Sequence, residues 1–200
     1  MRIPLEESVA EIEVLSSHFH AILLPFTDPG SLDETLKSIK KRYPKADHYP
    51  FAYRVGDLIK NSDDGEPSGA AGRPFSSLLE EKEVDRALLI CVRYFGGSKL
   101  GLPRLRRTFL DAAKASLDKA KLGTIVIEES YRLSLSYHDF EILKAFAKKK
   151  GYSLCDIDYG EAVSLTIVGS DAIPEEIKHM GIIVDASPLG KRERIAEETL

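Results

Sequence analysis

The residues best suited to chemistry gather in one glycine-rich stretch, residues 93–107, which reads RYFGGSKLGLPRLRR. Paired glycines and a lysine lead into three arginines within four positions, and no aspartate or glutamate falls between Asp85 and Asp111. Guanidinium groups and the free N–H groups of a helix N-terminus both bind phosphate-like anions. The predicted anion- or nucleic-acid-binding residues are Arg73, Arg93, Gly96, Gly97, Lys99, Arg104, Arg106 and Arg107.

This charge is unusual because a helix is expected to begin at Pro103, which puts Arg104, Arg106 and Arg107 in its first turns. Cations there oppose the helix dipole by about 0.3–1 kcal/mol each, a cost that a bound anion would reverse. Alternatively, the arginines pair with carboxylates of the fold, such as Asp111 one turn beyond Arg107. The GxxxxGK[ST] and GxGxxG spacings are both missing, so the stretch indicates anion affinity and not nucleotide hydrolysis.

A second loop, residues 63–74, reads DDGEPSGAAGRP and carries the opposite charge. Asp63, Asp64 and Glu66 could hold a hard cation such as Mg²⁺, but the DxDxD spacing of a calcium loop is missing. The alternative is a turn held by carboxylate–backbone hydrogen bonds and glycines. Ser68 lacks the GxSxG setting of a nucleophile. We therefore assign no metal, no cofactor and no catalytic residue.

Aromatic side chains accompany the cations. Tyr53 and Tyr94, with Phe51 and Phe95, could stack on the bases of a single strand. Aromatic residues that alternate along strands more often belong to a core, so both readings stay open.

Composition sets the class of protein. Of 200 residues 43% are hydrophobic, enough for a proper core, and the net charge of −4 argues against an indiscriminate nucleic-acid coat. Residues 1–124 hold 19 Lys/Arg and 18 Asp/Glu, whereas residues 125–200 hold 9 and 14, so a basic surface must be local. No apolar run is long enough to cross a membrane. Cys91 and Cys155 lack metal or disulfide spacing, and we expect a soluble cytoplasmic protein with reduced, buried thiols.

A first domain, residues 1–124, is expected to hold both loops. Its expected elements are strand-like residues 11–26, a helix over 31–46, two strands within 49–62 joined at Gly56–Asp57, a helix from Pro74, a buried strand over 86–95 and a helix over 103–121. Ser31 and Glu34 have the spacing of a capping box.

A second domain, residues 125–200, follows a change of character near Gly123. Its expected elements are a strand over 124–140, a helix over 141–151, strands over 152–160 and 161–170, a helix over 173–181 and a strand over 182–188. This β-α-β-β-α-β order is the ferredoxin-like pattern. The charged residues 190–200 are expected to form a solvated helix or a frayed tail. The predicted fold class is α+β, with two α/β sandwich-type domains.

Three segments carry a resemblance to a known family: HYPFAYR at 48–54, DDGEPSGAAGRPF at 63–75 and RYFGGSKLG at 93–101. Together they resemble the IMPACT family in its YigZ-like bacterial branch. The positions matching the first two motifs are His48, Ala52, Tyr53, Arg54, Asp64, Gly65, Glu66, Pro67, Ser68, Gly69, Ala71, Gly72, Arg73 and Pro74. Those matching the third, and the helix after it, are Arg93, Tyr94, Phe95, Gly96, Gly97, Lys99, Leu100, Gly101, Leu105 and Arg107. Pro103 and Arg104 stand where the family usually has a glycine pair, and Tyr49–Pro50 where it has Asn-Cys.

The resemblance implies an N-terminal domain similar to domain 2 of ribosomal protein S five and a ferredoxin-like C-terminal domain. It also implies a role in regulating translation, with RNA or the ribosome as partner. We therefore favour a non-enzymatic RNA- or ribosome-associated regulator. The alternatives are a metal-dependent phosphoester- or nucleotide-processing enzyme using Asp63, Asp64 and Glu66, and a protein-binding module whose acidic second domain docks a basic partner. The oligomeric state stays open.

Overall fold

A computed structural model describes residues 1–169, 173–180 and 184–197. The chain forms two compact units, Met1–Thr124 together with Glu197, and Ile125–Ala196. Each unit combines an antiparallel sheet with helices, so the predicted α+β class is confirmed. Among the described residues, none of the helices is both long and apolar enough to span a membrane.

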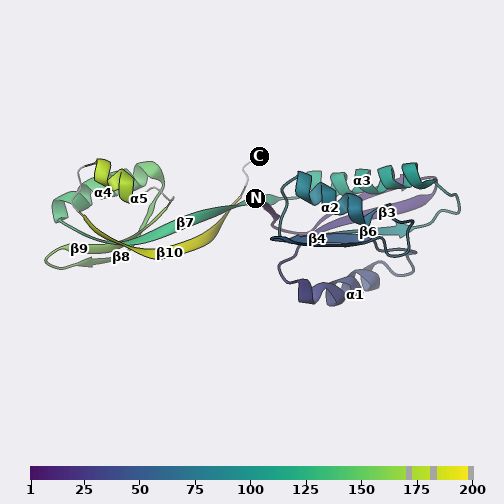
Figure 1. The fold of residues 1–200 in the computed structure, drawn as a ribbon, viewed down its shortest axis with the longest axis horizontal. Helices are drawn as coiled ribbons and strands as arrows, with labels where there is room; N and C mark the ends of the chain where they lie inside the picture. Colours follow the sequence, from purple (N-terminus) through teal and green to yellow (C-terminus); the bar gives the residue numbers. More distant parts are fainter. Residues whose placement is uncertain (170–172, 181–183, 198–200) are drawn as a thin grey trace. The chain divides into compact units, whose positions relative to one another are not determined.

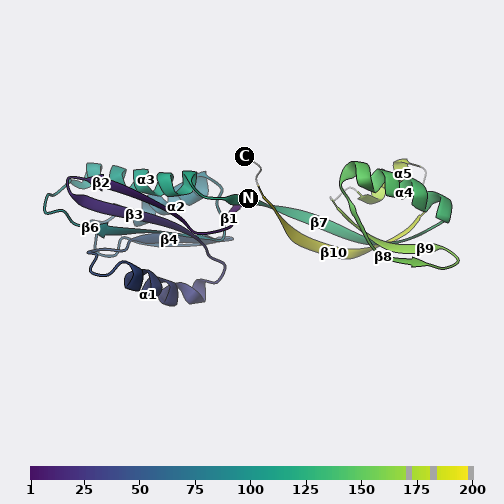
Figure 2. The same cartoon turned by 180° about the vertical axis from the view of Figure 1, so that it is seen from behind.

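The sheet of the first unit has the strand order β2–β3–β6–β4–β5, and all neighbours are antiparallel. Its strands are β2 (Ser8–Val14), β3 (Ser17–Pro25), β4 (Phe51–Val55), β5 (Leu58–Ser62) and β6 (Ala87–Tyr94). Helices α2 (Gly72–Glu81) and α3 (Leu102–Asp118) cover one face, and α1 (Leu32–Arg42) covers the other (Figure 1). The reverse view in Figure 2 shows the same three layers. A short strand, β1 (Arg2–Pro4), pairs with residues 122–124.

Strand β6 lies at the centre of this sheet and is buried because helices cover both faces. Its side chains alternate between two cores: Ala87, Leu89 and Cys91 pack with α2 and α3, and Leu88, Ile90 and Val92 pack with α1. The strand ends at Tyr94, immediately before the glycine-rich turn. The best-buried strand of the unit therefore fixes the start of that turn.

Residues 11–26 form a hairpin and not one strand. Val14 of β2 pairs with Ser17 of β3 across the turn residues Leu15 and Ser16, whose φ angles are 48° and 58°. Glycine and asparagine are the usual residues at such angles. Since neither is present here, no turn signal was visible in the sequence.

Two local predictions are wrong. Ser31 does not cap α1 with its side chain, because its hydroxyl donates to the carbonyl oxygen of Asp28 instead. Cys91 is buried as expected, but Cys155 is exposed on the second unit.

The second unit follows the predicted β-α-β-β-α-β order. Its elements are β7 (Leu122–Leu135), α4 (Tyr137–Lys150), β8 (Ser153–Tyr159), β9 (Val163–Gly169), α5 (Ile173–His179) and β10 (Val184–Glu197). The strand order is β10–β7–β9–β8, and both helices lie on one face of the sheet (Figure 1). Residues 170, 181–183 and 198–200 of the predicted elements lie outside the described residues.

The charged end of the chain is a strand through Glu197, so the predicted helix or tail is wrong for residues 190–197. Ion pairs accompany this polar segment in the sheet. Arg192 and Arg194 both contact the carboxylate of Glu128, at 3.0 and 2.5 Å. Lys191 contacts Glu129 at 2.6 Å.

Candidate functional site

A cleft of about 400 Å³ opens near the end of β6. The loop that leads into α2 contributes Glu66 and Pro67 to its wall. The loop that leads into α3 contributes Phe95, Lys99 and Leu102. Both glycine-rich loops therefore line the same cleft. A binding site that uses residues of both loops needs this arrangement.

The floor of the cleft contains a buried ion pair. Nη1 of Arg93 lies 2.8 and 2.7 Å from the two carboxylate oxygens of Glu66. The side chains are only 8% and 1% exposed. The guanidinium carbon also lies 5.3 Å from the ring centroid of Phe19 and 5.5 Å from that of Phe95. Arg93 was expected to bind an external anion, and that expectation must be revised because its charge is already neutralised.

One hydrogen-bond donor of the Arg93 side chain is unsatisfied. The Nε atom of Arg93 is buried and has no hydrogen-bond partner among the described residues. Buried donors without acceptors are rare because each costs about 1–3 kcal/mol. Arg93 is also one of the residues that line the cleft.

Asp63 holds the N-terminus of α2. Its carboxylate accepts hydrogen bonds from the backbone N–H groups of Gly69, Ala71 and Gly72, at 2.8, 2.9 and 2.8 Å. Partial burial acts to raise the pKa of this carboxyl, but the three N–H donors outweigh it and hold the pKa below its ordinary value. The helix dipole of α2 is therefore already met by a carboxylate of the chain.

An Asp63→Asn variant is expected to lose about 1–2 kcal/mol of stability at pH 7, because a neutral acceptor replaces a carboxylate. Since the folded-state pKa of Asp63 is lowered, its contribution is fully present above the unfolded pKa of about 3.9 and is lost as the pH falls through the folded value. Urea unfolding at pH 7 and at progressively lower pH measures this. A difference between wild type and variant that does not shrink on acidification contradicts the assignment.

Asp64 and His48 tie the acidic loop to the segment before β4. The carboxylate of Asp64 accepts from the backbone N–H of Tyr49 at 2.8 Å. Nδ1 of His48 lies 2.7 Å from the carbonyl oxygen of Asp64. Because a carbonyl oxygen only accepts, Nδ1 of His48 is the donor. Gly65 packs beneath this ring, and a Cβ there would lie 3.1 Å from it at a φ of +86°.

The three carboxylates of the acidic loop thus serve three different partners. Asp63 caps α2, Asp64 accepts from a backbone N–H and Glu66 pairs with Arg93. No three His, Cys, Asp or Glu side chains cluster as a metal site anywhere in residues 1–169, 173–180 and 184–197. The turn reading of this loop fits the geometry better than the magnesium reading.

The exposed cations that surround the N-terminus of α3 are Arg73, Lys99, Arg104, Arg106 and Arg107. We call these five residues the basic corner. Within the described part of the chain none of these five residues has an ion-pair partner. The Arg107–Asp111 pair that the alternative reading required is therefore not formed. Helix α3 has Gly101 at its N-cap, no side-chain cap and no acidic residue in its first turn. Unlike α2, this helix offers its dipole and its cations to an outside anion.

A second hollow, of about 410 Å³, joins the two loops on this side. Ser68 and Gly69 line it from the acidic loop, and Arg73 and Ser77 line it from α2. Arg106 of α3 completes the wall. Cations of two helices thus border one hollow beside the uncapped end of α3.

The two glycines of the turn have different roles. A Cβ at Gly96 would lie 2.2 Å from the carbonyl carbon of Ser16, so the turn packs directly on the β2–β3 hairpin. Gly97 has open space around it but a φ of +86°. Neither glycine presents a binding group of its own, and both shape the turn that positions Lys99.

Two motif residues lie away from the cleft. Tyr53 is 4% exposed and packs against Phe26 on the α1 side of the sheet. Arg54 pairs in register with Ala87 at the start of β6, whereas the cleft lies at the other end of that strand. Its neighbours there include Glu80 of α2. The structure therefore separates Tyr53 and Arg54 from His48.

Asp47 is a site residue that the sequence did not reveal. Its carboxylate accepts from the backbone N–H of Phe95 at 2.7 Å, and its own N–H donates to the carbonyl of Arg93. The only local signal was its place directly before His48. The contact spans nearly fifty residues of sequence, so no spacing rule predicts it.

Fold and cleft together define an α+β protein of two units, in the first of which two glycine-rich loops meet beside an uncapped, basic helix N-terminus. The Impact N-terminal domain matches residues 15–117, just over half of the chain. The chain belongs to the IMPACT family, which confirms the resemblance seen in its motifs.

Individual relatives are also named as members of the IMPACT family. The chain is 40% identical over 94 residues to the "IMPACT family member in pol 5'region" of Thermus thermophilus; this covers 46% of the chain and about half, 52%, of that relative. It is 25% identical over 160 residues to "IMPACT family member YigZ" of Escherichia coli strain K12, covering 78% of each. A crystal structure described as that of a hypothetical protein has a TM-score of 0.61 and 22% identity, covering 94% of this chain and 97% of the other. That last likeness shows the fold alone.

Proposed function

We propose that this protein is a non-enzymatic regulator of translation that acts in the cytoplasm and binds the phosphate backbone of RNA, including ribosomal RNA. The observation that carries the proposal is the basic corner: five exposed cations without ion-pair partners among the described residues, at a helix N-terminus without a cap. The role in translation rests on what the resemblance to the IMPACT family implies.

The distribution of charge favours an extended anionic ligand such as an RNA backbone. The chain is acidic as a whole, so the basic corner is a local positive field and not part of a general basic coat. Arg104 and Arg107 border one hollow and Arg106 borders another, so the cations face more than one direction around the helix end. Such a spread suits successive phosphates of a strand better than one small anion.

The affinity for single-stranded RNA is expected to fall with salt. If four of the five cations contact phosphates, log K against log salt has a slope of about −3, because each phosphate contributes about −0.7. Arg104→Ala with Arg107→Ala removes two contacts and moves the slope to about −1.4. Fluorescence anisotropy with a labelled oligomer measures the slope, and co-sedimentation with ribosomes across the same salt series tests the biological target.

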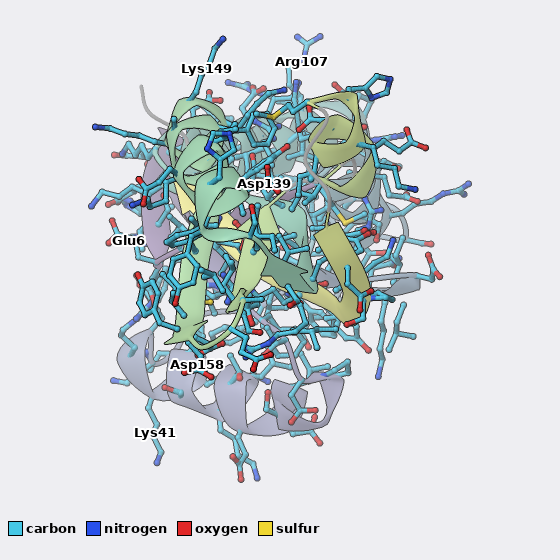
Figure 3. All side chains as sticks on the ribbon, turned by 90° about the vertical axis from the view of Figure 1, so that its left-hand side faces the viewer. Glu6, Lys41, Arg107, Asp139, Lys149 and Asp158 are labelled. Atoms are coloured by element: carbon cyan, nitrogen blue, oxygen red, sulfur yellow. The ribbon has the colours of Figure 1, made fainter. Side chains whose placement is uncertain are left out.

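A matched control comes from α1, on the opposite face of the sheet. Lys37→Ala with Lys41→Ala removes the same charge from exposed residues. Figure 3 shows Arg107 and Lys41 pointing away from the first unit in opposite directions. Affinity that is flat in salt, or equal losses in the two double variants, rules out the basic corner as the RNA-binding surface.

The enzyme alternative requires Asp63, Asp64 and Glu66 to hold one metal ion, whereas each of these carboxylates contacts a different partner within the chain. A basic protein partner for the acidic residues 125–200 stays a prediction, because no contact of the described residues points to one.

A further inference from the structure

Phe95 is an aromatic side chain that the fold leaves outside every core. It is 44% exposed at the wall of the cleft. The other aromatics considered for base stacking are placed elsewhere: Phe51 and Tyr53 are buried, and Tyr94 is half-buried against the same α1-side core. Of those four aromatics, Phe95 is the one that is largely exposed and lines the cleft.

The backbone that carries Phe95 is held rigidly. Its N–H donates to the carboxylate of Asp47 at 2.7 Å, and the next N–H, that of Gly96, donates to the hydroxyl of Ser17 at 3.0 Å. Direct packing of Gly96 on Ser16 removes the remaining freedom. A partly exposed apolar ring is thus held at the cleft wall by two separate segments, the one before β4 and the β2–β3 turn.

The cleft beside the ring suits a flat heterocycle. Its volume of about 400 Å³ lies within the range of small-ligand sites. Leu100 and Leu105 supply apolar wall, while Lys99 supplies a donor. The unpartnered Nε of Arg93 lacks an acceptor, and ring nitrogens and carbonyl oxygens of a base are acceptors.

The cleft and the basic corner share a wall. Gly101 and Leu102, the N-cap and first residue of α3, line the cleft. Leu102 also lines the second hollow together with Arg73 and Arg106. A nucleotide whose base enters the cleft therefore has its phosphates beside the uncapped helix end.

We propose that the cleft receives one unpaired base of single-stranded RNA, which stacks on Phe95 while the basic corner holds the flanking phosphates. The inference rests on the proposed RNA binding and adds a preference for unpaired over double-stranded RNA. Stacking is tolerant of sequence because every base has a π-face, so the site selects unpaired RNA and not one base.

The test uses the full chain and a short RNA with one 2-aminopurine, whose fluorescence falls when it stacks. Wild type is expected to quench the probe on binding. Phe95→Ala is expected to abolish the quench and weaken binding about 5- to 150-fold, the range for loss of one stacked base, with the salt slope unchanged. Phe95→Tyr keeps a ring and is expected to retain both properties, whereas Phe95→Leu keeps apolar volume and loses them.

Different experimental outcomes contradict the base site and the proposed RNA binding. Wild-type binding that is as tight for an abasic strand as for the intact strand, or for a duplex as for a single strand, overturns the base site and leaves phosphate binding standing. A Phe95→Ala variant that quenches like the wild type overturns it as well. RNA that does not bind at all, or binds independently of salt, overturns the proposed function and the base site together. Far-ultraviolet circular dichroism of each variant confirms that it is folded.

Discussion

Replacing Glu66 with alanine is expected to lower the free energy of unfolding of the first unit by about 3–5 kcal/mol. The variant leaves the Arg93 guanidinium buried between two aromatic rings without its counter-charge. A buried, unpaired charge costs far more than the net value of the pair, because the desolvation penalty stays and the attraction is gone. The same change frees the acidic loop from β6, so the cleft loses its floor.

The measurement is urea unfolding followed by far-ultraviolet circular dichroism, because the chain has no tryptophan. Hydrogen exchange of peptides from β6 assigns the loss to the first unit, since two units need not unfold together. Glu80→Ala, an exposed change on α2, is the control and is expected to cost less than about 0.5 kcal/mol.

A double variant separates charge from volume. Glu66→Leu with Arg93→Met replaces the pair by apolar side chains and is expected to recover most of the stability, as such replacements of buried pairs often do. If Glu66→Ala is as mild as Glu80→Ala, the pair is not desolvated and the description of the cleft floor is wrong.

A Gly96→Ala variant is expected to be destabilised by about 3 kcal/mol or more, at the upper end of overpacking effects. The added Cβ would lie 2.2 and 2.3 Å from the carbonyl carbon and oxygen of Ser16 and 2.5 Å from the nitrogen of Ser17. All three are backbone atoms, so no side-chain rotation relieves the overlap and the hairpin turn itself must move. RNA binding is expected to fall as well, because Phe95 and Lys99 flank this position.

Gly97→Ala is the matched control one residue away. A Cβ there meets nothing within 4 Å, and only the φ of +86° opposes it, at about 1–2 kcal/mol. Thermal and urea unfolding of both variants gives the comparison. Equal losses would show that backbone conformation alone, and not the contact with the hairpin, demands the glycine pair.

Much of the fold was predictable because it depends on local patterns. The helical spacing of apolar residues predicted the buried face of α3, and a continuous apolar run predicted the buried strand β6. Both are buried in the structure. The order of elements in residues 125–200 predicts the ferredoxin-like unit without any knowledge of tertiary contacts. The β2–β3 hairpin was missed, because Leu15 and Ser16 adopt left-handed φ angles without the glycine or asparagine that usually marks such a turn.

The candidate site was predictable only in outline. His48, Tyr53 and Arg54 are neighbours in one motif, yet strand alternation and register put Tyr53 in a core and Arg54 at the far end of β6. The strand formed by residues 190–197 contacts Glu128, more than sixty positions earlier. Contacts of that separation leave no local trace.

The sequence by itself determined that cations without nearby carboxylates collect at the start of α3, because charge and helix position are properties of neighbouring residues. Only the tertiary structure decided which cations are available. Arg93 sits on a strand buried on both faces and is neutralised by Glu66, whereas the basic corner lies on the exposed starts of α2 and α3 and on the turn that holds Lys99, and it stays unpaired among the described residues. Burial decides the use of a charge, and burial is set by segments far apart in the chain.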